Sequence, residues 1–257
     1  MQKWLNDLHA IILKQGFDPE GGASGGGSGG GSGVLVGKYL GDTYTGSQKE
    51  AIANGTFEGL NIGDYWTING INWRIADFDY YYNVGDTAFT KHHVIIVPDT
   101  ILYETRMGSS QSERVYSSTE LHQNIFRARN YFHDAFGATY IPSHRALYSN
   151  AITDGIPSNW AWRNMEVELM SEEQVYGHAV WGFGTQNGYD VGTQKTQFRL
   201  FSLDQSKINI RVNYWLTNVK SLGEFSYMDM NGNANFNTAS SSLGVRPFAC
   251  VVGDPEQ

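Results

Sequence analysis

Apolar residues near the start of the chain recur at the period of an α-helix. They are separated by three or four positions, so residues 2–15 are predicted to form a helix with one apolar face. Gly16 is suited to end this helix, and Pro19 prevents its continuation. A helix this short is marginal in water by itself, so the face is expected to bind a partner; packing on the downstream domain of the same chain is the alternative. The residues of the face are Trp4, Leu5, Leu8, Ile11 and Ile12.

Residues 21–33 contain only Gly, Ser and one Ala. Such a tract cannot bury apolar surface, and it predicts a flexible linker with a root-mean-square span of about 20 Å and an extended reach of about 45 Å. The chain is therefore divided into an anchor helix (1–20), a linker (21–33) and a domain (34–257). A linker engineered to join an anchor to a domain has the same composition, so both origins of the tract stay open.

The clearest pattern in the domain is a β-hairpin over residues 62–75. Two alternating runs flank Asn69-Gly70, a pair that readily adopts the positive φ angles of a type I′ turn. A second pair, Asn231-Gly232, predicts another hairpin turn. Further strands are expected over residues 93–97, 167–170, 198–203, 214–219, 225–230 and 245–252.

One long helix is predicted over residues 119–136. Thr119 is suited to the N-cap, apolar residues from Leu121 to Phe136 follow the helical period, and Gly137 ends the pattern. No second linker interrupts residues 34–257, so they are expected to form one domain. Its class is α+β, with antiparallel sheets and one long helix.

Composition narrows the classes of function. The formal net charge is −8, without a stretch of basic residues, which disfavours binding to nucleic acid or to an anionic membrane surface. A single cysteine, Cys250, excludes an intramolecular disulfide. We expect no membrane insertion, because no run of about 18 apolar residues is present, and the N-terminus lacks the pattern of a secretory leader.

The residues with reactive side chains have simpler structural interpretations. Cys250 lies in an apolar run, where a buried cysteine acts as a small hydrophobe. His92 and His93 are neighbours in a predicted strand, so they point to opposite faces and cannot chelate one ion together. Glu166 and Glu168 share a strand face that is expected to be solvated. We therefore predict no catalytic residue, no metal site and no cofactor.

Two aromatic groups are candidates for ligand binding. Tyrosine offers a large amphipathic surface at low entropic cost, and indole rings stack on sugars, but core packing is an alternative for both groups. The candidates are Tyr80, Tyr81, Tyr82, Trp160 and Trp162.

The C-terminal part of the chain carries a more specific signal. Tyr214-Trp215-Leu216 is followed by the Asn231-Gly232 turn and then by Gly244-Val245-Arg246-Pro247. This order resembles an uncharacterised domain family of bacteria and phages, whose members end in a Trp-Leu-Arg-Ser-Pro strand, an Asn/Asp-Gly turn and a Gly-Val-Arg-Pro strand. The likeness extends over about residues 57–252. The chain departs from the family at residues 217–219, where Thr-Asn-Val replaces Arg-Ser-Pro.

The resemblance implies a C-type-lectin-like fold, of the kind found in formylglycine-generating enzymes and in the phage tropism determinant. It also implies structural roles for three residues. Trp215 belongs in the core, Arg246 serves as a hydrogen-bonded or ion-paired anchor, and Pro247 stands where no backbone donor is needed.

Versions of this family with a stretch similar to Glu168-Leu169-Met170-Ser171 occur among phage structural proteins. The resemblance and the linker together suggest a phage virion surface protein, either a capsid decoration protein or a head fibre, assembled in the host bacterial cytoplasm. Residues 1–20 would bind the capsid or another virion protein, and the domain would face a host-surface glycan or protein. Homo-oligomerisation stays open. One alternative is a tail receptor-binding protein for host attachment. The other is an enzyme on the formylglycine-generating fold, which the missing second cysteine disfavours.

Overall fold

The computed structural model describes residues 37–109, 115–153, 156–182 and 196–254. The predicted anchor helix and the Gly/Ser linker lie outside these residues. The described part is mixed α+β, as predicted, with sheets that are mostly antiparallel. Its helices are too short or too polar to cross a membrane.

The first five-stranded sheet has the order β1-β2-β3-β12-β7 and is antiparallel throughout. Its strands are β1 (Tyr65–Ile68), β2 (Ile71–Phe78), β3 (His93–Pro98), β7 (Val167–Leu169) and β12 (Pro247–Val252). The predicted hairpin is confirmed: β1 and β2 are joined by Asn69 and Gly70, whose φ angles are 53° and 76°. The predicted strands that became β3 and β7 are confirmed too.

The second five-stranded sheet has the order β10-β9-β8-β11-β4. It is antiparallel except where β11 runs parallel to β8. Its strands are β4 (Tyr103–Arg106), β8 (Tyr214–Ser221), β9 (Glu224–Met228), β10 (Ala234–Thr238) and β11 (Ser242–Val245). The predicted strands over 214–219 and 225–230 are confirmed as β8 and β9, and Gly232, with φ of 93°, lies in the turn after β9.

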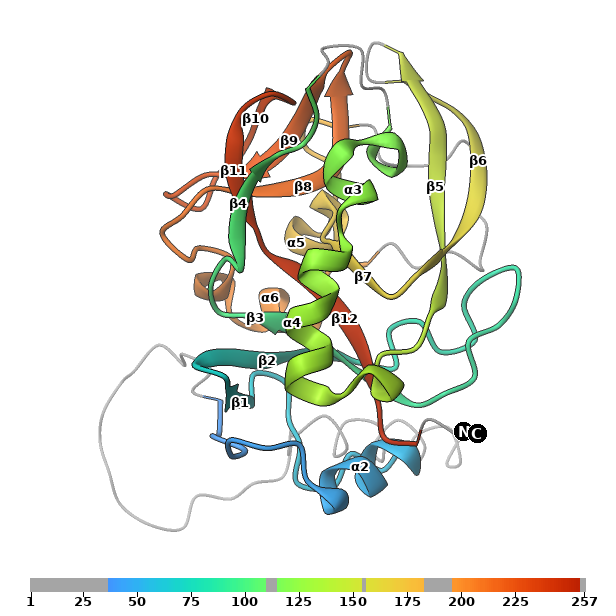
Figure 1. Cartoon of the computed structure of the whole chain (residues 1–257), viewed down its shortest axis with the longest axis vertical. Coiled ribbons are helices and arrows are strands. Elements are labelled where there is room, and N and C mark those ends of the chain that lie inside the picture. Colours follow the sequence, from blue (N-terminus) through green and yellow to red (C-terminus); the bar gives the residue numbers. More distant parts are fainter. Residues whose placement is uncertain (1–36, 110–114, 154–155, 183–195, 255–257) are drawn as a thin grey trace, which may run out of the picture. The chain divides into compact units, whose positions relative to one another are not determined.

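The first sheet is buried on both faces, which explains the continuous apolar runs of its central strands. Alternate residues of β3 and β12 enter two apolar clusters. One cluster also receives Phe132 and Phe136 from α4 (Phe126–Phe136), and the other receives Phe201 from α6 (Arg199–Leu203) and Phe198 from its N-cap. Figure 1 shows α4 lying over β12.

The predicted long helix is present as two helices. Thr119 caps α3 (Glu120–Gln123) by accepting a hydrogen bond from the His122 N–H, and the helix restarts as α4 after Asn124. Gly137, with φ of 90°, ends α4 as expected. The remaining helices and 3₁₀ turns are α2 (Gly46–Ala53), α5 (Glu172–Tyr176), η1 (Tyr116–Ser118), η2 (Ala138–Tyr140) and η3 (Gln205–Lys207).

Two strand predictions were wrong in detail. Residues 199–203 form α6, with Phe198 as the N-cap. Phe198 and Phe201 are three positions apart and pack into one cluster, a helical spacing that the short apolar run concealed. Residues 245–252 are not one strand, since Arg246 interrupts them. The chain leaves the second sheet at the end of β11 and enters the first sheet at the start of β12.

Arg246 is fully buried at this crossing between the sheets. Its Nε donates to the Pro98 carbonyl at 2.9 Å, and its Nη1 donates to the Ile208 carbonyl and the Tyr214 hydroxyl, both at 3.2 Å. Trp215 is also fully buried and donates to the Thr105 carbonyl at 3.0 Å. Pro247 is buried as the first residue of β12. The three signature residues thus lie in the interior, and Arg246 joins the two sheets through its bonds to Pro98 of β3 and Tyr214 of β8.

Candidate functional site

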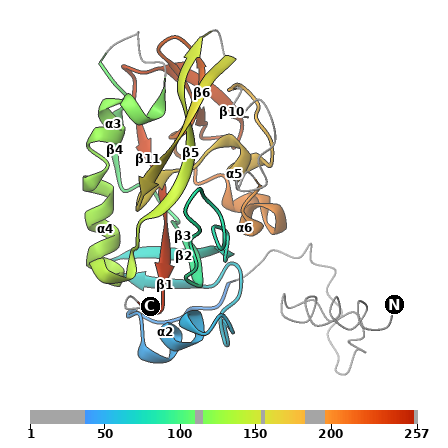
Figure 2. The ribbon, with the colours of Figure 1, turned by 90° about the vertical axis from the view of Figure 1, so that its right-hand side faces the viewer.

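A two-stranded ribbon, β5 (His144–Thr153) and β6 (Ile156–Met165), pairs with neither large sheet among the described strands. Figure 2 shows it between α4 on one side and α5 and α6 on the other. An isolated two-stranded ribbon is marginally stable, so its place depends on side chains packed beneath it. Trp160 and Trp162 belong to β6, where they pair with Ser149 and Leu147 of β5.

Two small hollows lie beneath this ribbon. The first, here called the Gln174 hollow, has a volume of about 30 Å³ and is lined by Tyr81, Arg145, Trp162 and Gln174 among others. The second, the Glu173 hollow, has a volume of about 40 Å³. Each has room for about one or two water molecules. Both are lined by Leu147, Tyr148, Ser171 and Thr217.

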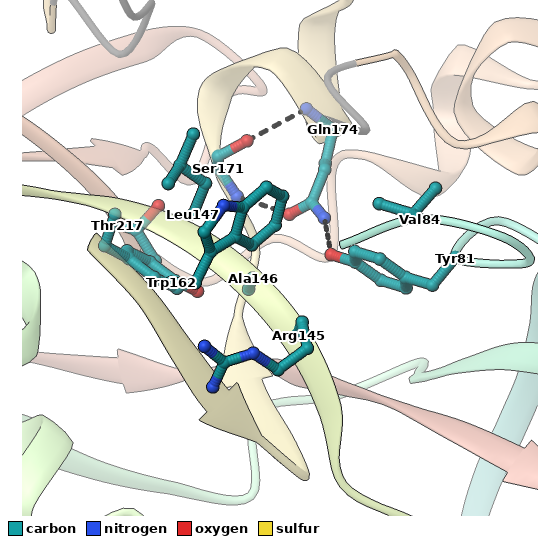
Figure 3. A pocket seen from close by; sticks show the side chains of 10 residues that line it. Tyr81, Val84, Arg145, Ala146, Leu147, Trp162, Ser171, Gln174 and Thr217 are labelled. Carbon is teal, nitrogen blue, oxygen red and sulfur yellow. Dashed lines mark hydrogen bonds between the residues drawn. The ribbon is translucent and has the colours of Figure 1, made fainter. Parts of the chain in front are cut away.

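A capping box at the start of α5 builds the wall of the Gln174 hollow. Ser171 Oγ accepts a hydrogen bond from the Gln174 N–H at 3.2 Å, and Gln174 Oε1 accepts one from the Ser171 N–H at 2.8 Å. This arrangement leaves Gln174 Nε2 to donate to the Tyr81 hydroxyl at 3.0 Å, as Figure 3 shows. Arg145 is held at the same hollow by Asp86, to which it donates from Nε at 2.6 Å and from Nη2 at 2.8 Å.

Two adjacent glutamates of α5 have different surroundings. Glu172 accepts hydrogen bonds from the backbone N–H groups of Val180, Trp181 and Gly182 at 2.7–3.2 Å, so it fixes the following loop. Burial raises the pKa of Glu172. Glu173 faces the Glu173 hollow instead, where it accepts hydrogen bonds from Asn218 Nδ2 at 3.2 and 3.4 Å.

Glu168 corrects the expectation of a solvated pair of carboxylates. Its side chain is 1% exposed and accepts a hydrogen bond from the Tyr116 hydroxyl, while His122 Nδ1 lies 3.2 Å from Oε2. Burial opposes protonation of His122, but the adjacent Glu168 carboxylate raises the pKa of His122 overall. Glu166 points to Arg129, 3.3 Å away, in a more exposed position.

The predicted tyrosine surface is not present as an exposed patch. Tyr80 and Tyr81 are 3% and 6% exposed and belong to the cluster that includes Phe198. Tyr80 donates to the Thr196 carbonyl at 2.6 Å, and Tyr82 stacks on His92 at 4.6 Å between ring centres. The run is buried because residues 77 and 78 end β2 and the chain then folds back over the first sheet. Of the three tyrosines, Tyr81 lines a hollow under the ribbon.

The structure places the predicted tryptophans at neighbouring hollows. Trp162 lines the Gln174 hollow together with Tyr81, and Trp160 lines the Glu173 hollow. Both indoles are half-buried. Their sequence positions alone did not show that these residues share one side of the ribbon with Tyr81.

The sequence did not reveal the polar floor beneath the ribbon, which consists of the polar residues Ser171, Glu173, Gln174 and Asn218 in the linings of the two hollows. Residues 171–174, Ser-Glu-Glu-Gln, match the pattern of a capping box, and this signal predicts the start of α5. It does not predict burial, because two consecutive glutamates usually mark a solvated first turn. Tyr116 and Asn218 reach the floor from η1 and β8, far away in the sequence.

The remaining reactive side chains have structural surroundings. Cys250 is buried, which raises the pKa of its thiol well above the usual value. Asp229 accepts hydrogen bonds from the N–H groups of Asn231 and Asn233, so its loop is a hydrogen-bonded turn. In the part of the chain that the structure describes, no three His, Cys, Asp or Glu side chains form a group suited to a metal ion.

The two hollows present groups that can stack on a ligand or form hydrogen bonds with it. Aromatic rings, hydroxyl groups and side-chain amides line both hollows, which are small enough to admit only the headgroup of a ligand. Comparisons with protein-family models, curated proteins and solved structures found no match to this chain.

Proposed function

We propose that this chain is a phage virion surface structural protein, a capsid decoration protein or head fibre, that displays a ligand-binding domain. Residues 1–20 bind the capsid or another virion protein, and residues 21–33 act as the tether. The observation that carries the proposal is the succession of an apolar helical pattern and a Gly/Ser tract that cannot bury it. A face of this kind next to such a tract is suited to an external partner.

The organisation of the described domain supports this division. Residues 37–257 form one unit, and its described residues contain two apolar clusters. The proposal includes a C-type-lectin-like fold. The antiparallel sheets support it, as does Arg246, the arginine of the Gly-Val-Arg-Pro signature, at the crossing between them.

We place the ligand-binding site beneath the β5–β6 ribbon, and we propose binding rather than catalysis there. Trp160, Trp162 and Tyr81 provide aromatic surface, while Gln174 and Ser171 provide hydrogen-bonding groups already fixed by the capping box. Fixed neutral groups beside aromatic rings favour recognition.

These tryptophans also favour a second candidate, a tail receptor-binding protein that contacts a host-surface glycan. Electron microscopy of virus particles labelled with a gold-tagged antibody against residues 37–257 separates the two functions. Gold over the head is expected for a decoration protein or head fibre. Gold confined to the tail would establish the second candidate, and particles without gold would refute a virion location.

A further inference from the structure

Glu173 is a buried carboxylate without a cationic partner among the described residues. Glu173 is 2% exposed. Among the described residues, its carboxylate accepts hydrogen bonds from one group, the side-chain amide nitrogen of Asn218. The ion pairs of the described residues do not include Glu173. A buried carboxylate normally has a charged partner or several donors, because removing the charge from water is costly. Glu173 therefore has acceptor capacity that a ligand can use.

The space in front of Glu173 is suited to a cation. The Glu173 hollow is lined by the rings of Tyr116, Tyr148 and Trp160, and aromatic faces attract cations through their quadrupoles. Ser149, Ser171 and Thr217 supply hydroxyl groups to the same lining. A primary ammonium has three N–H donors and no acceptor, so carboxylate and hydroxyl oxygens complement it.

A second buried carboxylate, Glu168, lies near this region and is paired with His122. Glu168 accepts the hydroxyl of Tyr116, and burial followed by the charge of Glu168 raises the pKa of Tyr148 well above its usual value. The nearby basic side chains have partners other than Glu173. His122 lies against Glu168, and Arg163 Nη2 donates a hydrogen bond to Asn150 Oδ1 at 3.3 Å. The Glu173 carboxylate itself remains available to an incoming cation.

The size of the hollow selects among cations. About 40 Å³ accommodates a group as large as one or two water molecules, and an ammonium headgroup meets this limit. A trimethylammonium group or a sugar ring is larger and fits this small hollow less well. A ligand would insert its headgroup and leave the rest of its structure at the mouth of the hollow.

We propose that the Glu173 hollow binds the primary ammonium group of a small ligand, with Glu173 as its counter-ion and Trp160 against its side. This rests on the proposed ligand-binding function of the domain and specifies its chemistry. It also assigns the two tryptophans different tasks, since Trp162 lies at the neighbouring hollow, away from the carboxylate.

The test uses the full-length protein with ¹⁵N-labelled tryptophan and ethylammonium chloride as the probe, at constant ionic strength. We expect a saturable shift of the Trp160 indole resonance. Ethanol, which is neutral and of similar size, and tetramethylammonium, which is larger, should cause no saturable shift. Glu173→Gln preserves the shape of the side chain and should weaken ethylammonium binding about tenfold or more, because it removes the counter-ion.

Glu166→Gln is the matched control, since it removes a more exposed carboxylate paired with Arg129, and it should bind the probe like the wild type. If Glu173→Gln lowers the melting temperature, Trp160→Leu provides a second test and should weaken binding severalfold. The inference is overturned by the absence of saturation at about 100 mM probe, by equal binding of ethanol, or by unchanged affinity in both variants.

Particle association provides the separate test of the proposed function. Loss of probe binding with intact particle association would remove the ammonium inference alone. Probe binding by a protein that does not associate with particles would remove the virion proposal alone.

Discussion

Arg246 Nε donates to the carbonyl oxygen of Pro98 at 2.9 Å, across 148 positions of the sequence. The bond joins the last residue of β3 to the crossing between β11 and β12. No ion pair of Arg246 is found among the described residues, so its charge is compensated by carbonyl dipoles and by the rings of Phe201 and Tyr214. A guanidinium held in this way fixes the spacing of the two sheets.

The Arg246→Ala variant should lose much of the stability of the domain. The change leaves the Pro98 and Ile208 carbonyls without their buried donor, at a cost of about 1–3 kcal/mol each, and creates a cavity. We expect a sharp fall in melting temperature or soluble yield. Arg246→Lys should recover only part of it, because an ammonium cannot reproduce the planar fork. A melting temperature equal to that of the wild type would contradict this structural role.

Two buried histidines should make the domain less stable in mild acid. Burial lowers the pKa of His93 to about 4 and that of His144 to about 3. Because these values lie below those of the unfolded chain, the unfolded state takes up protons first as the pH falls. The contribution of the two neutral histidines to the free energy of unfolding is complete above about pH 6.5. As the pH falls from there towards the folded pKa values, each histidine loses about 1.4 kcal/mol of this contribution per pH unit.

Denaturant unfolding of the wild type and of His144→Phe at pH 7 and pH 5 measures this contribution. The variant should lose about half of the histidine-dependent slope, because His93 remains. His178→Ala, at an exposed position, should retain the slope of the wild type. Burial raises the pKa of Asp77 and Glu172, which act in the opposite direction, so the difference between variant and wild type isolates His144. Equal slopes in His144→Phe and the wild type would contradict the assignment.

Residues 34–257 expressed alone should unfold as one cooperative unit. The two apolar clusters share β3 and β12, so neither can lose its packing without exposing the other face of the first sheet. Calorimetry should give a single transition whose calorimetric and van't Hoff enthalpies agree. Two resolved transitions would reveal a domain boundary that the sequence does not show.

Local chemistry made part of this fold predictable. Asn69-Gly70 predicted its hairpin because few other pairs tolerate positive φ at both positions, and the apolar runs predicted β3 and part of β12. The α6 helix was mistaken for a strand because five residues are too few to distinguish the two periods.

The candidate site was less predictable, because its parts come from distant segments. The β5–β6 ribbon was not predicted, although Asp154-Gly155, the pair between its two strands, favours a two-residue hairpin turn and was overlooked in the sequence. Trp160 and Trp162 were identified as candidates, but Glu173 was not. Its burial depends on the ribbon folding over α5, which no local pattern records.

Co-sedimentation with virus particles tests the central proposal, that residues 1–20 anchor the displayed domain. Burial of Trp4 and Leu8 in a partner would contribute about 1.5–3 kcal/mol each, so the double variant Trp4→Ala, Leu8→Asp should be lost from particles while residues 37–257 remain folded. Asn6→Asp, which adds a charge outside the apolar set, is the control and should keep the wild-type copy number. Double-variant protein that sediments with particles at the wild-type copy number would contradict the proposal.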